Sequence, residues 1–286
     1  MSGSIQFGIA PLIAGSTLVL NSRFDAERIL KNTEQYRATI LAGVPTMWKL
    51  MFDVLKEKSY DLSSVRWCMS GVAPIEKELV KKIFEICPIV SNPLGMTETS
   101  GFCSGFHGVS DIEVVASTVG KIFENLNYKI IDANTGKTCQ HEEVGLLVFK
   151  GPSVIKSYTN SSISLTNDGY FITNDLASED NNGYIKLYGR FDDMFTVGGY
   201  NVYPAEIETY IKNNFAVKDV VIVPKPHETM GNVCKAYIVP ENEICVKKII
   251  DKMEKEIIYY KIPKDIVMCN SLPKNELGKI VRKRIK

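Results

Sequence analysis

Residues 189–208 read Gly189-Arg190-Phe191-Asp192-Asp193-Met194-Phe195-Thr196-Val197-Gly198-Gly199-Tyr200-Asn201-Val202-Tyr203-Pro204-Ala205-Glu206-Ile207-Glu208, and the pattern of the chain changes across them. After them, the sequence predicts a strand-helix-strand-strand-helix module, with Pro204 in a first helical turn where its missing N–H costs nothing. We therefore predict two domains, residues 1–189 and 190–286. Arg190 supplies a fixed fork of donors, and the Gly198-Gly199 pair permits close approach of a ligand, so polar residues here are placed to act between the domains.

The first domain is predicted to be α/β. Helical patterns alternate with short apolar runs, which implies βα units and a largely parallel sheet. The helices are expected at residues 26–35, from Pro45, and at 75–86, and the apolar strands at 38–42, 65–69 and 89–91. From about Gly120, short runs separated by Gly, Asn and Asp turns predict a β-rich subdomain.

Both ends of the chain are predicted to form ordinary folded structure. The apolar segment 5–20 has no basic start and is broken by Gly8, Pro11 and Gly15, so it predicts a buried helix and a strand rather than a signal peptide or membrane span. The basic end, residues 279–286, has isoleucines and a valine between its charges, which favours a solvated helical face over a nucleic-acid tail.

Charge and cysteine content limit the possible partners and compartment. Lys and Arg number 34 against 33 Asp and Glu, a formal net charge of +1, which gives no electrostatic case for nucleic acid or an anionic membrane. The seven cysteines are scattered, without a C-x-x-C pair, which is typical of reduced thiols in a cytoplasmic protein. Evidence for a binding partner must therefore come from particular sites.

Four segments contain residues suited to phosphate chemistry. Asn92-Pro93-Leu94-Gly95-Met96-Thr97-Glu98-Thr99 follows a predicted strand and offers hydroxyls and a carboxylate for a phosphate–Mg²⁺ group, although it could simply cap a helix. Asp175 ends an aromatic run and could accept two ribose hydroxyls or cap its own turn. The boundary stretch is the third segment. Lys279, after a glycine, could donate to developing negative charge or belong to a surface hairpin.

In this order, the four segments resemble the adenylate-forming (AMP-binding) superfamily of acyl- and aryl-CoA ligases, luciferases and peptide-synthetase adenylation domains. Gly43-Val44-Pro45-Thr46-Met47 and Ser70-Gly71-Val72-Ala73-Pro74 extend the resemblance over nearly the whole chain. The sequence of residues 197–208 is similar to that of the acyl-CoA synthetase branch. The resemblance implies a truncated large adenylate-forming domain followed by a small, mobile α+β C-terminal domain.

The resemblance also implies a role for each matching residue. Thr97 would contact the α-phosphate, Glu98 would bind Mg²⁺, and Lys279 would bridge the attacking carboxylate and the α-phosphate. Asp175 would bind the ribose with help from Arg190, Asp192 would be the hinge, and Gly198 and Gly199 would border the CoA tunnel. The remaining nucleotide contacts would come from Gly71, Ala73, Pro74, Asn92, Leu94, Gly95 and Met96.

The implied activity is that of an ATP-dependent carboxylate–CoA ligase acting on fatty or other acyl substrates. A carboxylate would attack the α-phosphate of MgATP to give acyl-AMP, and CoA would then displace AMP. Both steps build charge on oxygen, so they need a cation and fixed donors rather than a protein nucleophile. The alternatives are a non-catalytic homologue that binds nucleotide or CoA and, since no carrier segment follows Lys279, less favourably a peptide-synthetase-type adenylation domain.

The sequence departs from the family pattern in several respects. No Gly- and Ser/Thr-rich phosphate loop occurs, so we expect a fragment that a missing N-terminal half would complete, with a sheet edge and an apolar face left exposed. Leu94 stands where an aromatic side chain commonly stacks on adenine, which is expected to weaken ATP binding. Asn174 replaces the glycine before Asp175 and is the mildest change, because Asn tolerates positive φ better than most residues.

Overall fold

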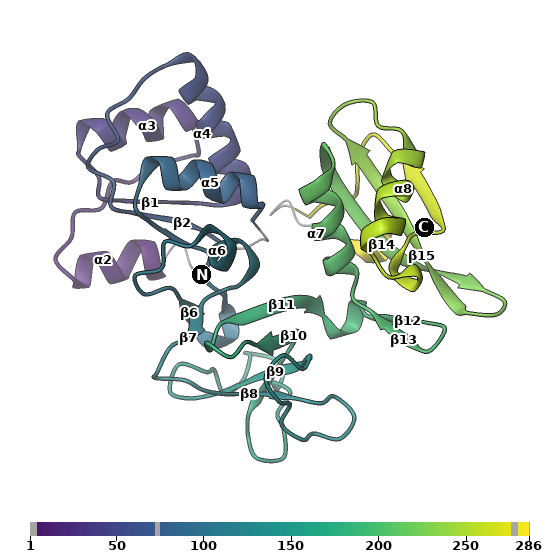
Figure 1. Cartoon of the computed structure of the whole chain (residues 1–286). Coiled ribbons are helices and arrows are strands. Elements are labelled where there is room, and N and C mark those ends of the chain that lie inside the picture. The colour runs from purple at the N-terminus through teal and green to yellow at the C-terminus, as the bar shows by residue number, and fades with distance from the viewer. Residues whose placement is uncertain (1–4, 72–74, 276–279, 286) are drawn as a thin grey trace. The chain divides into compact units, whose positions relative to one another are not determined.

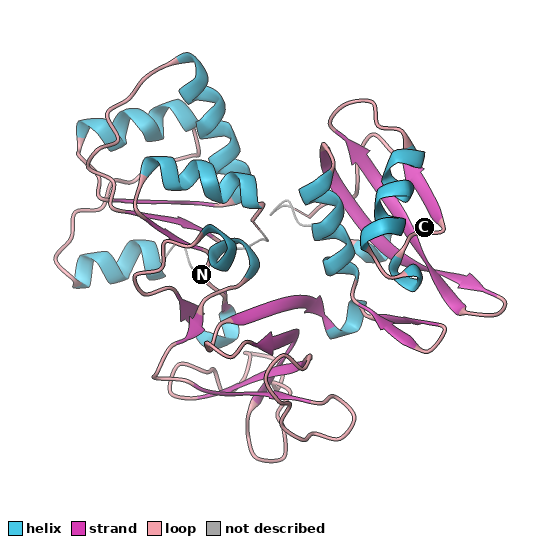
Figure 2. Cartoon of the chain, in the orientation of Figure 1, coloured by secondary structure: helices cyan, strands magenta, loops and turns pink. Residues whose placement is uncertain are grey.

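The computed structural model describes residues 5–71, 75–275 and 280–285. Its chain divides into two compact units (Figure 1). Unit 1 comprises Met1–Thr173 and Ala177–Leu187, and unit 2 comprises Asn174–Leu176 and Tyr188–Lys286. Figure 2 shows helices and strands in both units, so the mixed α/β class predicted from the sequence is confirmed.

Unit 1 contains a three-stranded parallel sheet in the order β1-β2-β3, as predicted. The strands are β1 (Ile40–Gly43), β2 (Trp67–Ser70) and β3 (Ile89–Ser91), and the connecting helices are α3 (Ala26–Gln35), α4 (Pro45–Glu57) and α5 (Lys77–Ile86). The Asp25 side chain caps α3 by accepting a hydrogen bond from the Arg28 N–H, and Pro45 occupies the first turn of α4. All three helices pack into one hydrophobic core with the strands.

The two faces of this sheet differ in burial. The row Leu41, Cys68 and Val90 is buried under α3, α4 and α5, which Figure 1 shows on one side of β1 and β2. On the opposite face, Ile40 and Ile89 are 50% and 38% exposed. Met69, on the same face, is only 4% exposed, so this face is apolar and open at the start of β1 and β3 and covered farther along the strands.

The prediction for the N-terminal segment is wrong. It forms a π-helical turn, η1 (Ile5–Ile9), and a short helix, α2 (Ala10–Ile13), while residues 16–20 form no strand. Leu12 and Ile13 are largely exposed rather than buried. A helix of four residues makes few internal hydrogen bonds, and Gly15 at φ 73° follows it, so the apolar run does not extend into a longer buried helix.

The β-rich part of unit 1 is built around a sheet in the order β11-β10-β9-β8. Its strands are β8 (Asn127–Ile131), β9 (Gly145–Lys150), β10 (Phe171–Glu179) and β11 (Ile185–Arg190). Two antiparallel strand pairs, β4 (Gly95–Met96) with β5 (Gly101–Phe102) and β6 (Ser104–Gly105) with β7 (Lys121–Ile122), and the helix α6 (Ile112–Ser117) precede it. Leu147 and Phe149 of β9 are fully buried in its core.

Unit 2 has the predicted α+β character. Strands β14 and β15 are antiparallel and β15 and β16 are parallel, while α7 precedes β14 and α8 lies between β15 and β16. The elements are β12 (Phe195–Val197), β13 (Tyr200–Val202), α7 (Pro204–Asn214), β14 (Val217–His227), β15 (Gly231–Pro240), α8 (Val246–Glu256), η4 (Tyr259–Lys261), β16 (Asp265–Met268) and η5 (Arg282–Arg284). The predicted helical face at the basic end is wrong for the described residues 280–285, which form a single turn, η5.

Candidate functional site

The carboxyl ends of β2 and β3 hold the first group of predicted site residues. Gly71 directly follows β2, is buried, and donates its N–H to the Gly43 carbonyl at 3.3 Å. Asn92 directly follows β3 and is also buried. The Ser70 hydroxyl at this edge is buried and has no hydrogen-bond partner among the residues that the structure describes. Ligands of open parallel sheets bind outside these strand ends, so the edge is chemically suited to one. Ala73 and Pro74 lie outside the described residues.

The next turn depends on a close contact at Gly95. A Cβ atom there would lie 2.8 Å from Phe102 Cδ1 and 2.9 Å from the Gly101 carbonyl oxygen, so only glycine lets β4 pair with β5 at this spacing. Met96 completes β4, and the single turn η2 (Thr97–Thr99) follows. This turn leaves Thr97 exposed and Glu98 half-buried, so both side chains can reach solvent or a ligand.

A second segment of unit 1 holds Glu98. The Tyr158 hydroxyl donates to the Glu98 carboxylate, and the Ile155 N–H donates to the Glu98 carbonyl at 2.9 Å. The Ser100 hydroxyl binds the Ser153 carbonyl at 2.7 Å. Sequence analysis missed Tyr158, because sixty positions separate it from Glu98 and no local pattern connects them.

Leu94 belongs partly to the protein core. Its side chain packs against the cluster that contains Cys103, Val119 and Leu126. Its N–H donates to Ser104 Oγ at 2.9 Å, and its carbonyl accepts from the Cys103 N–H at 2.9 Å. The backbone at Leu94 is therefore fixed, and the side chain offers an aliphatic surface where the family pattern has an aromatic ring.

Unit 2 brings the predicted ribose and hinge residues together. Arg190 at the end of β11 contacts Asp175 of β10 through Nη1 and Oδ1 at 3.0 Å, and the Asp175 side chain is 16% exposed. Asn174 adopts φ 63°, as expected for a residue in place of glycine. Its amide donates to Asp192 Oδ2 at 3.0 Å, and Asp192 lies in the single turn η3 (Phe191–Asp193). Strand β10 is thus bonded to both Arg190 and Asp192.

Two further predicted loops belong to unit 2. Gly198 and Gly199 form the turn between β12 and β13 with φ of 58° and 87°, where L side chains are strained. Lys279 lies outside the described residues, but the two ends of its segment are paired. Lys274 bridges Ile280, and the Val281 N–H donates to the Pro273 carbonyl at 2.8 Å.

Arg282 is a structurally central residue whose contacts sequence analysis missed. Its guanidinium contacts Asp193 Oδ2 at 3.1 Å, Glu208 Oε2 at 2.7 Å and the Ile222 carbonyl at 2.8 Å. Burial alone would lower the Arg282 pKa, but the Glu208 hydrogen bond and the charges of Glu208 and Asp193 outweigh it and raise that pKa. Glu208 and Asp193 both stand in the opening stretch, so the only available signal was their charge opposite that of Arg282.

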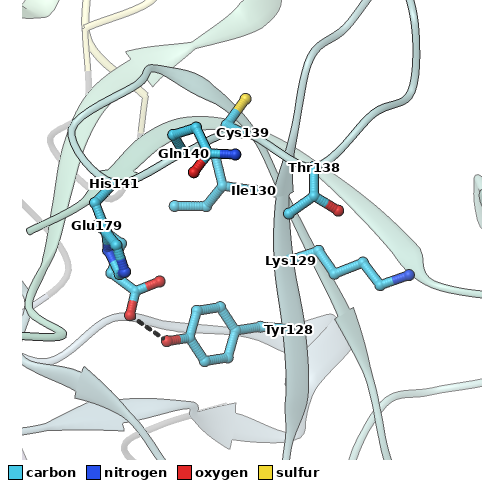
Figure 3. A pocket seen from close by; sticks show the side chains of 8 residues that line it. All are labelled: Tyr128, Lys129, Ile130, Thr138, Cys139, Gln140, His141 and Glu179. Carbon is cyan, nitrogen blue, oxygen red and sulfur yellow. Dashed lines mark hydrogen bonds between the residues drawn. The ribbon is translucent and has the colours of Figure 1, made fainter.

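Figure 3 shows a pocket of unit 1 that no predicted site residue lines, with a volume of about 420 Å³. Inside it the Tyr128 hydroxyl donates to Glu179 Oε1 at 2.9 Å. Burial and the neighbouring Glu179 carboxylate raise the pKa of Tyr128 to about 12. The pair closes one wall of the pocket with a satisfied hydrogen bond.

Two features are missing from the described residues. Within residues 5–71, 75–275 and 280–285, no three His, Cys, Asp or Glu side chains gather in a way that could hold a metal ion. In the same part of the chain, no helix has the length and apolar character needed to cross a bilayer.

Comparison with known proteins agrees with the fold. The family model of the AMP-binding enzyme matches residues 3–159, and that of the AMP-binding enzyme C-terminal domain matches residues 206–279. The chain is 32% identical to 4-coumarate–CoA ligase-like 8 of Arabidopsis thaliana over 98% of its own length and 52% of that protein. It is 28% identical to 2-succinylbenzoate–CoA ligase of Enterococcus faecalis over 96% of its own length and 57% of that protein.

Solved structures give the same result. ATP-bound MatB from Rhodopseudomonas palustris matches with a TM-score of 0.86 at 27% identity, over 99% of this chain and 56% of that one. The o-succinylbenzoate CoA synthetase MenE of Bacillus subtilis, in complex with its acyl-adenylate, matches with a TM-score of 0.86 at 28% identity, over 98% and 58%. The chain thus spans about half the length of the relatives it matches. It belongs to the family of AMP-binding enzymes, and the matched relatives are CoA ligases.

Proposed function

We propose that this chain supplies part of an ATP-dependent carboxylate–CoA ligase, which forms an acyl-adenylate and then a CoA thioester. The turn from Asn92 to Glu98 at the carboxyl end of β3 is the observation that carries the proposal. Its exposed Thr97 hydroxyl is available to an α-phosphate. The Glu98 carboxylate, bonded to Tyr158, is available to Mg²⁺. One hard oxygen ligand fits Mg²⁺, which takes its other ligands from phosphates and water and offsets their charge.

We assign the remaining roles by the same reasoning. The nucleotide would contact Gly71, Ala73, Pro74 and residues 92–96, and its ribose would bind Asp175. Arg190 supports this role because it holds the Asp175 carboxylate in place, and an ionised carboxylate accepts two hydroxyl hydrogens. Asp192 would be the hinge between domains 1–189 and 190–286, Gly198 and Gly199 would border the CoA tunnel, and Lys279 would bridge carboxylate and phosphate.

The partners in this proposal are a carboxylic acid of the fatty or other acyl type, ATP, CoA and a polypeptide that supplies an N-terminal half. The exposed Ile40 and Ile89 support the last of these, because an apolar sheet face calls for a covering layer. All seven cysteines are free thiols, which supports a cytoplasmic location.

Acyl-dependent exchange of pyrophosphate into ATP tests adenylation directly. The full chain would be assayed with a panel of aromatic and aliphatic carboxylic acids. We expect exchange that falls about 10²-fold or more in Glu98→Gln and Lys279→Ala, since each removes a charge placed against developing negative charge. Lys248→Ala, an exposed lysine of α8, is the matched control. Absence of exchange with every acid, by the chain alone and together with a supplied N-terminal half, would refute the ligase assignment for this polypeptide.

Leu94 favours a second candidate, a non-catalytic homologue that binds nucleotide or CoA. Its side chain packs on the core and gives adenine no aromatic surface, and base stacking on such a surface is worth about 1–3 kcal/mol. This candidate predicts calorimetrically measurable nucleotide or CoA binding without exchange. Leu94→Tyr should then tighten nucleotide binding and still give no exchange.

A further inference from the structure

The two carboxylate oxygens of Glu98 have different surroundings. Oε1 accepts a hydrogen bond from the Tyr158 hydroxyl, whereas Oε2 accepts none from the residues that the structure describes. Glu98 is half-buried, and Tyr158 is 42% exposed. One oxygen is thus held by the protein, and the other is available to a ligand.

The backbone at Glu98 is fixed from outside its own turn. The Ile155 N–H donates to the Glu98 carbonyl at 2.9 Å, and the Ser100 hydroxyl donates to the Ser153 carbonyl at 2.7 Å. Within the turn, the Ser100 N–H donates to the Thr97 carbonyl at 3.1 Å. The remaining freedom of the Glu98 side chain is therefore rotation about its own bonds.

Tyr158 also has a defined backbone. Its N–H donates to the Ser161 carbonyl at 2.9 Å, and Ser157 pairs with Ser162 in an antiparallel bridge. Earlier in the same segment, Val154 packs against the core of the β-rich part. The hydroxyl thus reaches Glu98 from a turn that is anchored to unit 1, and its hydrogen bond restricts the rotation of the carboxylate.

Mg²⁺ and Ca²⁺ make different demands on a carboxylate. Mg²⁺ requires near-octahedral oxygen ligands, keeps several waters, and takes one or two carboxylates beside the phosphates of a substrate. Ca²⁺ accepts about six to eight oxygens in a flexible geometry, often with both oxygens of one carboxylate. An oxygen that already accepts a hydroxyl hydrogen has less room and less charge for a metal ion. A carboxylate bonded in this way is left with one favourable oxygen, which suits Mg²⁺ better than Ca²⁺.

We propose that Tyr158 sets the metal specificity of this site. It occupies Oε1, so that Glu98 binds a metal ion through Oε2 alone and favours Mg²⁺ over Ca²⁺. The inference rests on the proposed ligase function, which brings Mg²⁺ to Glu98 together with ATP. Tyr158 is a positioning residue in this scheme, because it acts through Glu98. Tyr158→Phe would free Oε1, and the carboxylate could then bind with both oxygens.

Isothermal titration with α,β-methylene-ATP tests the inference without turnover, because this analogue lacks the bond that adenylation breaks. The full chain, alone and with a supplied N-terminal half, would be titrated in excess Mg²⁺ and again in excess Ca²⁺. Wild type should bind the analogue more tightly with Mg²⁺. Loss of a residue that orients a metal ligand typically weakens metal binding about 10- to 100-fold, and because Tyr158 is partly exposed we expect about 10-fold with Mg²⁺ in Tyr158→Phe. Binding with Ca²⁺ should be unchanged or tighter, so the preference for Mg²⁺ should fall by about 10-fold or more.

Two comparisons separate positioning from general damage to the fold. Tyr36→Phe removes the hydroxyl of another exposed tyrosine of unit 1 and should keep the wild-type preference. Tyr158→Phe combined with Glu98→Gln should show the preference of Glu98→Gln alone, because Tyr158 then has no carboxylate to orient. A purely structural effect would weaken binding equally with both metal ions and in both backgrounds.

Three results would overturn the inference. They are an unchanged preference in Tyr158→Phe, a change that persists without the Glu98 carboxylate, and a wild type that binds the analogue equally with both metal ions or with neither.

Pyrophosphate exchange separates this result from the proposed function. Exchange that is lost in Glu98→Gln, with a metal preference indifferent to Tyr158→Phe, would remove the role of Tyr158 and keep the ligase. A preference that depends on both Tyr158 and Glu98, in a chain without exchange, would keep the role of Tyr158 and remove adenylation.

Discussion

Replacement of Arg282 by Met should destabilise unit 2 and leave unit 1 unchanged. The guanidinium joins η3, α7 and β14 through Asp193, Glu208 and the Ile222 carbonyl. Its side chain is 23% exposed and that of Glu208 is 15% exposed, so the substitution leaves a mostly buried carboxylate without its cation. Breaking a fully buried ion pair costs about 3–5 kcal/mol. Because solvent reaches part of this one, we expect about 2–3 kcal/mol.

The two tryptophans make the measurement specific. Trp48 and Trp67 both lie in unit 1, so fluorescence-detected urea unfolding reports that unit alone. Hydrogen exchange of peptides from α7 and β14 reports unit 2, where the expected loss corresponds to about 30- to 150-fold faster exchange. Arg282→Lys keeps the charge but loses the fork and should lie between wild type and Arg282→Met.

Arg284, exposed two residues later, provides the control. If Arg282→Met exchanges no faster than Arg284→Met, the three contacts contribute no net stability and the reasoning fails. A shift of the tryptophan transition in Arg282→Met, absent from Arg284→Met, would instead show that the two units unfold together.

Three further predictions concern other parts of the chain. The Tyr128 pKa is raised to about 12 by burial and Glu179, so the stability it gives is complete below pH 10 and is lost as pH rises through 12. Tyr128→Phe should therefore lower the free energy of unfolding by about 1 kcal/mol at pH 8 and reduce its decline between pH 10 and 12, and an unchanged decline in urea titrations would contradict this. Gly95→Ala should cost unit 1 about 1–3 kcal/mol in fluorescence-detected unfolding, because its Cβ would meet Phe102 and the Gly101 carbonyl; a cost below about 0.5 kcal/mol, the usual size of a surface effect, would refute the close contact. Asn174→Val should cost about 1–2 kcal/mol more than Asn174→Gly by hydrogen exchange of β10, since only the former strains the φ of 63°, and equal costs would contradict a left-handed backbone there.

Local patterns in the sequence predicted most elements well. Helix α3 and strand β3 begin and end where expected, because local sequence patterns, capped by Asp25 or ended by a turn, define them. The N-terminal segment failed because its burial depends on what packs against it. An apolar run predicts a buried helix only when another layer of structure covers it.

The candidate site was predicted less completely than the secondary structure. Motif residues such as Thr97, Glu98, Asp175 and Arg190 could be named because their types and order match the pattern of the AMP-binding family. The residues that contact and hold these side chains could not be named from the sequence. Tyr158 reaches Glu98 from sixty positions away, and Arg282 reaches Asp193 from 89, so only the folded chain shows these pairs. Contacts over such separations leave no periodic signal in the sequence.

The backbone of Asn174 also restricts how this position can change. Glycine would keep the left-handed turn and lose the amide that reaches Asp192. Aspartate tolerates the turn but would place a second carboxylate beside that of Asp192, and larger side chains would strain the backbone. Few single substitutions preserve both properties, so this position can change in few ways during evolution. A change to glycine keeps the turn but loses the hydrogen bond to Asp192.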